Sequence, residues 1–266
     1  MSLNINQDNV KEKTFQAVVF DIEGTTTSIS FVKDILFPYS LANVDRFFEN
    51  ALSTYSHSEI IDALIELSND EFRTHSGDVL KIERTELSEE NKKEVAKKLA
   101  TNVKFWICQD KKLSALKQLQ GIMWEEAYRS GEIKSHVYDD VLPTFQKLRS
   151  SNIPIYIYSS GSVHAQKLLF AYTETDDLTK FITGYFDTKI GAKVDPLSYN
   201  RIEKEIGVDA KRILFVTDVE TEAFAAKEAG MEVIIMIRPG NIPLSQKAHD
   251  AFCTFTTFQQ LQKLFT

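Results

Sequence analysis

Short apolar runs rich in β-branched residues recur along this chain, each closed by a polar or glycine-containing turn. Such runs predict buried strands, and they occupy residues 15–20, 153–158, 181–186, 213–217, 233–237 and 252–255. Helical patterns lie between the later runs, at residues 165–172, 196–206 and 220–229. Because strands alternate with helices, the sequence predicts an α/β fold with a parallel sheet and right-handed connections.

The connection after the first predicted strand is far longer than the others. About 130 residues separate Asp21 from the next strand, whereas a crossover between parallel strands needs only about a dozen. Their pattern is helical, with helices predicted over residues 43–55, 58–72, 88–109, 114–128 and 138–150. The sequence therefore predicts an α/β core made of residues 14–30 and 136–266, and an all-helical domain of residues 31–135 inserted after the first strand.

Composition narrows the partners that this chain is expected to have. With 266 residues and a net charge of −7, it is long enough for a large core but too acidic for a general binder of nucleic acid or anionic membranes. No apolar stretch approaches the roughly 18 residues that span a bilayer. Cys108 and Cys253 are too few for a disulfide framework and fit a reducing cytosol. We expect residues 1–13 to be a frayed polar tail, and the charged residues 81–98 to be a solvated helix face and loop.

The motif DIEGTTT, residues 21–27, directly follows the first predicted strand. Open α/β sheets bind their ligands at the carboxyl ends of the strands, so Asp21 and Glu23 stand where a ligand is expected. Two carboxylates this close repel each other unless a cation or a proton lies between them. A divalent cation with oxygen ligands resolves that repulsion and points to phosphate chemistry. An acidic pair in this position can also simply be solvated or cap the next helix.

Side chains that suit phosphate chemistry also follow later strands. These residues are Ser159, Ser160, Lys189, Lys193 and Asp218. A hydroxyl can hydrogen-bond phosphoryl oxygens, a lysine can stabilise the charge of the transition state, and a third carboxylate can complete the oxygen shell of Mg²⁺. Each residue alone has a simpler explanation as a helix cap or a surface lysine, but their common placement at one sheet edge favours a shared site.

From Phe15 to about Gly240 the chain resembles the haloacid dehalogenase-like phosphatases, which carry these groups in this order. The wider superfamily has aspartate where this chain has Glu23. Strings that resemble its enolase-phosphatase branch, of the methionine salvage pathway, are DIEGTTT, SFVKDILFPY, LKQLQGIMW, YIYSSGSVHAQKLLF, FDTKIGAKV and RPGN, and the match is weakest over residues 48–104. The resemblance implies a doubly wound parallel sheet covered by an inserted helical cap.

The resemblance also implies a two-step reaction. The substrate 2,3-diketo-5-methylthiopentyl-1-phosphate is first enolised and then dephosphorylated to the acireductone 1,2-dihydroxy-3-keto-5-methylthiopentene. Asp21 is expected as the nucleophile and Glu23 as general acid/base, with one Mg²⁺ per monomer held by Asp21, Glu23 and Asp218. Ser159 and Ser160 are expected to hold the substrate. Lys193 is the expected phosphate-site lysine, and Lys189 competes for that role.

Further residues are assigned as hypotheses. Glu23 is the candidate base for the enolisation, with Mg²⁺ or the region of Ser160 holding the developing enolate oxygen. Glu222 is a candidate partner for a water molecule on the metal. Three aromatic residues could form a wall for the methylthio tail, although each alone fits a helix core equally simply: Phe37, Trp124 and Tyr128.

Other classes of protein remain open from the sequence. One is a related phosphomonoesterase acting on another small ester, and another is a receiver-like signalling module that is phosphorylated on an aspartate. The phosphorylated aspartate of a receiver lies on a middle strand with no large helical insertion after it, which counts against that class. No expected group is missing, which counts against an inactive binding protein. We expect a monomer that binds only its small substrate, located in the cytoplasm and, in a eukaryote, also in the nucleus.

Overall fold

The computed structural model describes residues 15–74, 77–83 and 91–265. The predicted tail, part of the charged stretch 81–98 and the first residues of the helix predicted from residue 88 lie outside the described residues. Contacts divide the chain into two compact units. The α/β unit contains the residues before Lys33 and after Ile133, and the helical unit contains Lys33–Ile133.

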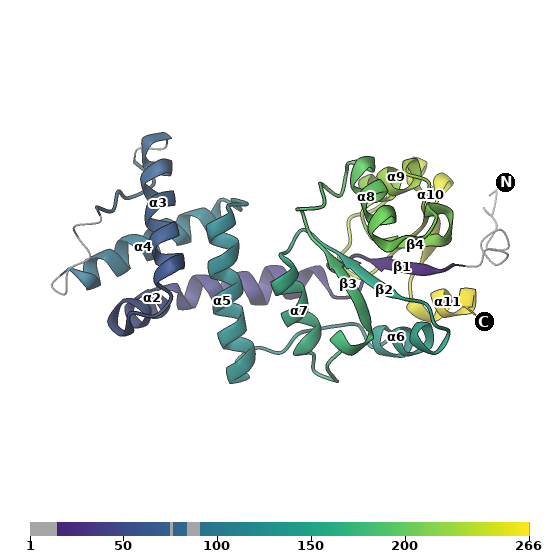
Figure 1. The fold of residues 1–266 in the computed structure, drawn as a ribbon, viewed down its shortest axis with the longest axis horizontal. Helices are drawn as coiled ribbons and strands as arrows, with labels where there is room; N and C mark the ends of the chain where they lie inside the picture. Colours follow the sequence, from purple (N-terminus) through teal and green to yellow (C-terminus); the bar gives the residue numbers. More distant parts are fainter. Residues whose placement is uncertain (1–14, 75–76, 84–90, 266) are drawn as a thin grey trace. The chain divides into compact units, whose positions relative to one another are not determined.

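The α/β unit is built on a six-stranded parallel sheet with the strand order β3-β2-β1-β4-β5-β6 (Figure 1). The strands are β1 (Ala17–Phe20), β2 (Ile155–Tyr158), β3 (Ile182–Phe186), β4 (Ile213–Thr217), β5 (Glu232–Met236) and β6 (Cys253–Phe255). The central strand β1 pairs with β2 on one side and with β4 on the other, and all its residues are buried. The prediction of a parallel sheet is confirmed, and its strand order reverses beside β1, where such sheets bind ligands.

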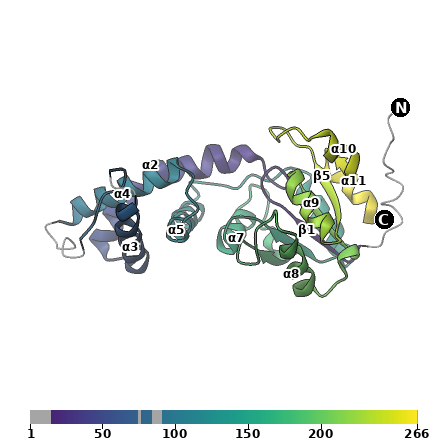
Figure 2. The same ribbon diagram turned by 90° about the horizontal axis from the view of Figure 1, so that it is seen from above.

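Helices cover both faces of this sheet. They are α6 (Val141–Ser150), α7 (Val163–Ala171), α8 (Pro196–Ile206), α9 (Glu220–Glu228), α10 (Gln246–Ala251) and α11 (Phe258–Gln262). On one face, Ala17 and Val19 pack in a core with residues of α8 and α9. On the other, the ring centroid of Phe20 lies 5.4 Å from that of Phe145 and 5.3 Å from that of Phe258. Figure 2 shows α8 and α11 on opposite sides of β1, as a doubly wound sheet requires.

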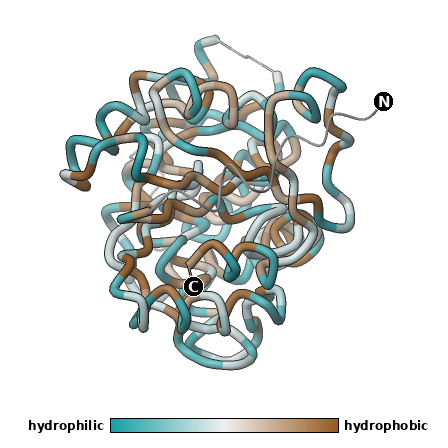
Figure 3. Tube along the Cα trace, turned by 90° about the vertical axis from the view of Figure 1, so that its right-hand side faces the viewer, coloured by the Kyte–Doolittle hydropathy of each residue, from teal (hydrophilic) through white to brown (hydrophobic). Residues whose placement is uncertain are grey.

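The helical unit has a hydrophobic core of its own. Its helices are α2 (Phe37–Thr54), α3 (Ser58–Thr74), α4 (Lys92–Cys108) and α5 (Ser114–Ser130). Phe48, Leu64 and Trp106 are fully buried in this core. Along the trace of the whole chain, hydrophobic and hydrophilic stretches alternate (Figure 3). This burial of one face of each helix is what the amphipathic pattern predicts.

Helical structure begins earlier than the sequence pattern indicated. A π-helical segment, Phe31–Leu36, leads directly into α2, whereas the sequence predicted the helix from Asn43. Pro38 lies in the first turn of α2, where its missing N–H group is tolerated. No helix of the described residues is long and apolar enough to cross a bilayer.

Candidate active site

The loop after β1 is a compact turn organised around one carbonyl group. The N–H groups of threonines 25–27 all donate to the carbonyl oxygen of Ile22, at 3.2, 2.9 and 3.0 Å. Gly24 has a φ of +72°, and a Cβ atom there would lie only 2.3 Å from Oδ2 of Asp218. Glycine is therefore needed both for its left-handed backbone and for the close approach of the Asp218 side chain, which follows β4.

Lys193 joins two buried carboxylates at the edge of the sheet. Its Nζ atom lies 2.5 Å from Oδ1 of Asp21 and 2.7 Å from Oε2 of Glu222. The side chains of Lys193, Asp21 and Glu222 are only 10%, 6% and 11% exposed. Burial alone would lower the pKa of the Lys193 ammonium, but Asp21 and Glu222 raise it, and the net shift is upward. Lys193 is therefore a permanent cation beside the Asp21 carboxylate.

The loop that carries Lys193 is fixed by the first residues of α8. The Tyr199 hydroxyl donates to the backbone carbonyl of Lys193 at 2.6 Å, and the Ser198 hydroxyl donates to that of Ala192 at 2.8 Å. Asp195 caps α8 by accepting from the N–H of Leu197 at 3.0 Å. The lysine is thus held by its backbone, so little freedom remains to be lost when it meets a ligand.

Asp218, directly after β4, carries a buried oxygen without a hydrogen bond. The residue is 8% exposed, and its Oδ1 atom has no partner. Burial raises the pKa of Asp218 to about 8, with Asp21 and Glu222 adding to the shift. A buried acceptor that lacks a donor is unfavourable unless a proton or a cation satisfies it.

These groups fit a hard divalent cation. No cluster of three or more His, Cys, Asp or Glu side chains with metal-binding geometry occurs in the described part of the chain. Such a cluster is not required, because Mg²⁺ keeps several of its waters and binds through one or two carboxylates. Asp21 and Asp218 supply two carboxylates at the ends of the adjacent strands β1 and β4.

The other predicted residues differ in exposure. Ser159 is buried after β2, and its hydroxyl oxygen accepts from the N–H of Gly161 at 3.3 Å. Ser160 and Glu23 are exposed. Neither Ser159 nor Ser160 is the cap of α7, since Ser162 takes that role by accepting from Ala165.

The two candidate lysines are also distinguished by their surroundings. Lys189 is exposed, and its backbone N–H donates to Oδ1 of Asp187 at 2.9 Å in a turn after β3. Lys193 is the one that contacts Asp21.

The sequence did not indicate the hydrogen bonds by which more distant residues hold the loop after β1. Arg238 binds Asp140 through two hydrogen bonds of 2.8 Å, and its Nε–H donates to the carbonyl oxygen of Thr25. Asn241 donates to the carbonyl of Gly24 at 3.0 Å, and the N–H of Tyr138 donates to that of Thr26 at 3.0 Å. Arg238 and Asn241 belong to the RPGN string, which carried the resemblance without suggesting a role.

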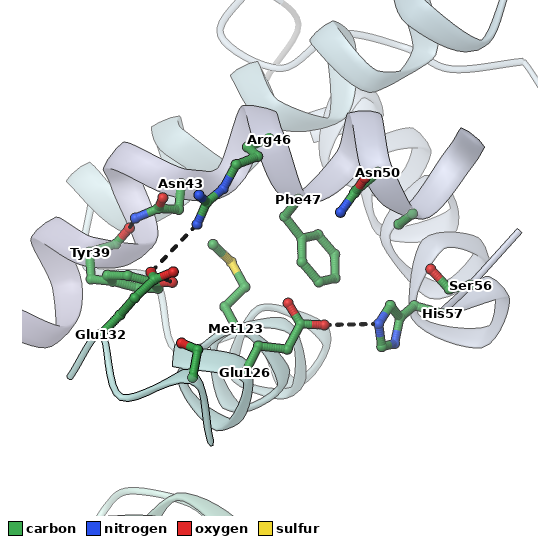
Figure 4. Close-up of a pocket in the computed structure, with 12 residues that line it drawn as sticks. Tyr39, Asn43, Arg46, Phe47, Asn50, Ser56, His57, Met123, Glu126 and Glu132 are labelled. Carbon is green, nitrogen blue, oxygen red and sulfur yellow. Dashed lines mark hydrogen bonds and ion pairs between the residues drawn. The ribbon is translucent and has the colours of Figure 1, made fainter. Parts of the chain in front are cut away.

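The helical unit contains a separate pocket of about 290 Å³ (Figure 4). Two ion pairs border it, with Arg46 and Glu132 3.5 Å apart and His57 and Glu126 3.2 Å apart. The aromatic residues predicted to form an apolar wall do not line this pocket. Phe37 packs edge-on against Trp124, whose indole N–H donates to the carbonyl of Leu36, and Tyr128 is buried.

Comparisons with known proteins agree with one another. Residues 15–230 match the family of haloacid dehalogenase-like hydrolases. The chain is 49% identical to enolase-phosphatase E1 of Caenorhabditis briggsae over 93% of this chain and 96% of that protein. Its identity to the Caenorhabditis elegans enolase-phosphatase E1 is 46%, over 93% and 97% of the two chains. The crystal structure of the UTR4 protein from Saccharomyces cerevisiae is similar, with a TM-score of 0.70 and 30% identity over 92% of this chain and 99% of that one.

Proposed function

This chain belongs to the haloacid dehalogenase-like hydrolases and, within them, to the enolase-phosphatase E1 family, and from this premise we propose that it converts a phosphorylated diketone into an acireductone and inorganic phosphate. The substrate is 2,3-diketo-5-methylthiopentyl-1-phosphate and the product is 1,2-dihydroxy-3-keto-5-methylthiopentene. The observation that carries the proposal is the contact between Lys193 and Asp21 beside Asp218, whose Oδ1 atom has no hydrogen-bond partner.

In the phosphatase step, Asp21 attacks phosphorus and the bond from phosphorus to the C1 oxygen breaks. Glu23 gives a proton to the departing oxygen and then removes one from the water that hydrolyses the aspartyl phosphate. Lys193 holds the nucleophile and faces the charge of the phosphoryl group, while Ser159 and Ser160 bind its oxygens. A Mg²⁺ ion would be held by Asp21, Asp218 and Glu23, and it would supply further positive charge against the phosphoryl oxygens.

In the enolase step, Glu23 removes a proton from C1. The electron pair of that C–H bond forms the C1–C2 double bond, and the oxygen on C2 takes up a proton to become the enol. Glu23 suits this role because it is exposed and stands two residues after the nucleophile. Its side chain is one methylene longer than aspartate, which supports reach to a carbon next to the phosphate ester.

The helical unit acts as the cap of this site, with the cap spanning residues 31–135 and the core residues 14–30 and 136–266. Its separate hydrophobic core supports this role, because a cap must keep its own fold while substrate enters and leaves. The enzyme works as a monomer in the cytoplasm, and in the nucleus of a eukaryote. Cys108 and Cys253 are free thiols, which suits a reducing compartment.

Two variants assayed on the diketone phosphate test the two steps separately. We expect Asp21→Asn to abolish phosphate release while enolisation, followed by the absorbance of the conjugated enol, continues. Glu23→Gln should slow both steps by about 10²-fold or more, as loss of a general acid/base does. Normal phosphate release by Asp21→Asn would refute the aspartyl-phosphate step, and unchanged enolisation by Glu23→Gln would refute its role as the carbon base.

A panel of other small phosphate esters tests the substrate. A similar rate on a sugar or nucleotide phosphate would favour a general phosphomonoesterase. Slow stoichiometric phosphorylation without turnover would favour a receiver-like module.

A further inference from the structure

The side-chain amide of Asn241 has only one orientation that satisfies its surroundings. Its nitrogen lies 3.0 Å from the carbonyl oxygen of Gly24 and 3.2 Å from that of Met236. Both neighbours are acceptors, so the NH₂ group must face them, because an amide oxygen there would have nothing to accept. The Oδ1 atom of Asn241 therefore points to the other side.

On that other side lies the carboxylate of Asp218. A Cβ atom placed on Gly24 would be 2.9 Å from Oδ1 of Asn241 and 2.3 Å from Oδ2 of Asp218, so both side chains converge on the same point. Oδ1 of Asn241 and Oδ1 of Asp218 are both buried without a hydrogen-bond partner. The Asp218 oxygen nearest that point is Oδ2, but both unpartnered atoms belong to the two side chains that meet there, and a buried acceptor without a donor is unfavourable.

A hydrated cation supplies what these two oxygens lack. A carboxylate can bind the cation directly, while a neutral amide oxygen suits a hydrogen bond from one of the waters that Mg²⁺ retains. Glycine at residue 24 permits the side chains of Asp218 and Asn241 to meet, because a Cβ atom there would clash with both.

We propose that Asn241 is a positioning residue of the Mg²⁺ site, with Oδ1 accepting a hydrogen bond from a water of the cation's hydration shell and Nδ2 holding the Gly24 carbonyl. The inference rests on the proposed function, since it concerns the cation that Asp21 and Asp218 hold. It gives the last residue of RPGN two roles at once, one for each end of its amide.

Titration calorimetry of the full chain with Mg²⁺ separates these two roles. Asn241→Ala removes both ends of the amide and should weaken Mg²⁺ binding by about 10- to 100-fold. Asn241→Asp loses the donor to Gly24 but keeps an acceptor and adds a negative charge, so its Mg²⁺ affinity should equal or exceed that of the wild type. If Asn241 only holds the loop, Asn241→Ala weakens Mg²⁺ binding and Asn241→Asp binds Mg²⁺ no more tightly than Ile242→Asp, which adds the same charge at the exposed neighbouring residue.

Three controls make every outcome decisive. Asn43 in the helical unit also donates through Nδ2 to a backbone carbonyl, that of Tyr39 at 2.9 Å, and Asn43→Ala should leave Mg²⁺ affinity unchanged. Thermal unfolding without Mg²⁺ reports whether each variant folds, and Asn241→Ser replaces Asn241→Ala if the latter does not. Asp218→Asn should weaken Mg²⁺ binding more than any change at Asn241.

The failures of the two proposals are distinguishable. A wild-type chain that does not bind Mg²⁺ would overturn the proposed metal site and the role of Asn241 with it. Binding that Asp218→Asn abolishes, but that Asn241→Ala leaves unchanged or Asn241→Asp weakens equally, would overturn the role of Asn241 alone.

Discussion

Two arginine–carboxylate pairs, one in each unit of this molecule, are exposed to very different degrees. In the α/β unit, the paired side chains of Arg238 and Asp140 are 5% and 7% exposed. In the helical unit, the side chains of Arg46 and Glu132 are 66% and 47% exposed at the rim of a pocket. Water screens the second pair and cannot reach the first.

The carboxylates of the buried pairs in the α/β unit accept further hydrogen bonds from buried groups. Asp140 accepts from the N–H of Phe258 at 2.9 Å, and Glu222 accepts from the Thr217 hydroxyl at 2.8 Å. A charge taken out of water must be satisfied by several partners, so each such group is bound to a particular geometry. Burial, more than the number of charges, therefore separates the candidate active site from the charged pocket of the helical unit.

The largest expected effect concerns stability. Arg238→Met should lower the free energy of unfolding by about 3–5 kcal/mol, because it leaves the Asp140 carboxylate buried without its partner. Arg46→Met should lower it by no more than about 1 kcal/mol, since the pair is exposed. Urea unfolding of both variants measures the difference, and adding Asp140→Asn to Arg238→Met should recover part of the loss. Equal losses of stability at Arg238 and Arg46 would show that the exposure of an ion pair does not determine its contribution to stability.

A smaller effect is expected for catalysis at the two candidate lysines. Lys193→Met should reduce phosphate release by about 10²- to 10³-fold, as loss of a charge that stabilises the transition state does. Lys189→Met should change it less than about twofold, because an exposed lysine is screened by water. Phosphate release under single-turnover conditions measures both. A larger effect at Lys189 would reverse the assignment.

Two glycines with similar backbone conformations test whether the close contact between residue 24 and Asp218 matters for activity. Gly24 and Gly131 have φ values of +72° and +78°, but a Cβ atom meets Asp218 at the first and nothing within 4 Å at the second. Alanine at either position should cost about 1–2 kcal/mol of stability for the left-handed backbone. Only Gly24→Ala should also slow phosphate release, by about 10²-fold, because it displaces Asp218. Equal activity in the two variants would mean that Asp218 tolerates the displacement.

The sequence was sufficient for the sheet and for the helical insertion, because both leave strong local periodicity. It missed α10 and α11, which are too short to show a clear helical repeat. It also placed the start of α2 too late, since Pro38 in the first turn hides the helical pattern.

The contacts around the candidate site were beyond the reach of sequence patterns. Asn241 and Gly24 are 217 residues apart, and Arg238 and Thr25 are 213 apart, so no local pattern connects them. Lys189 and Lys193 could not be separated by spacing, because the difference between them is burial. The catalytic roles themselves stay predictions.

The smallest expected effect lies in the helical unit, where Tyr39 donates to Oε2 of Glu132 at 2.8 Å. Burial, and then the Glu132 carboxylate, raises the pKa of Tyr39 from 10.0 to about 12. Between these values the folded chain holds a proton that the unfolded chain has lost, so this contribution to stability is complete below pH 10 and disappears as the pH rises through 12. Tyr39→Phe should therefore show a slightly flatter fall of stability across that window, measured by urea unfolding at each pH. Glu132→Gln should lower the Tyr39 pKa, which tyrosinate absorbance measures. An unchanged pKa would mean that burial of the Tyr39 hydroxyl, rather than the Glu132 carboxylate, accounts for the shift.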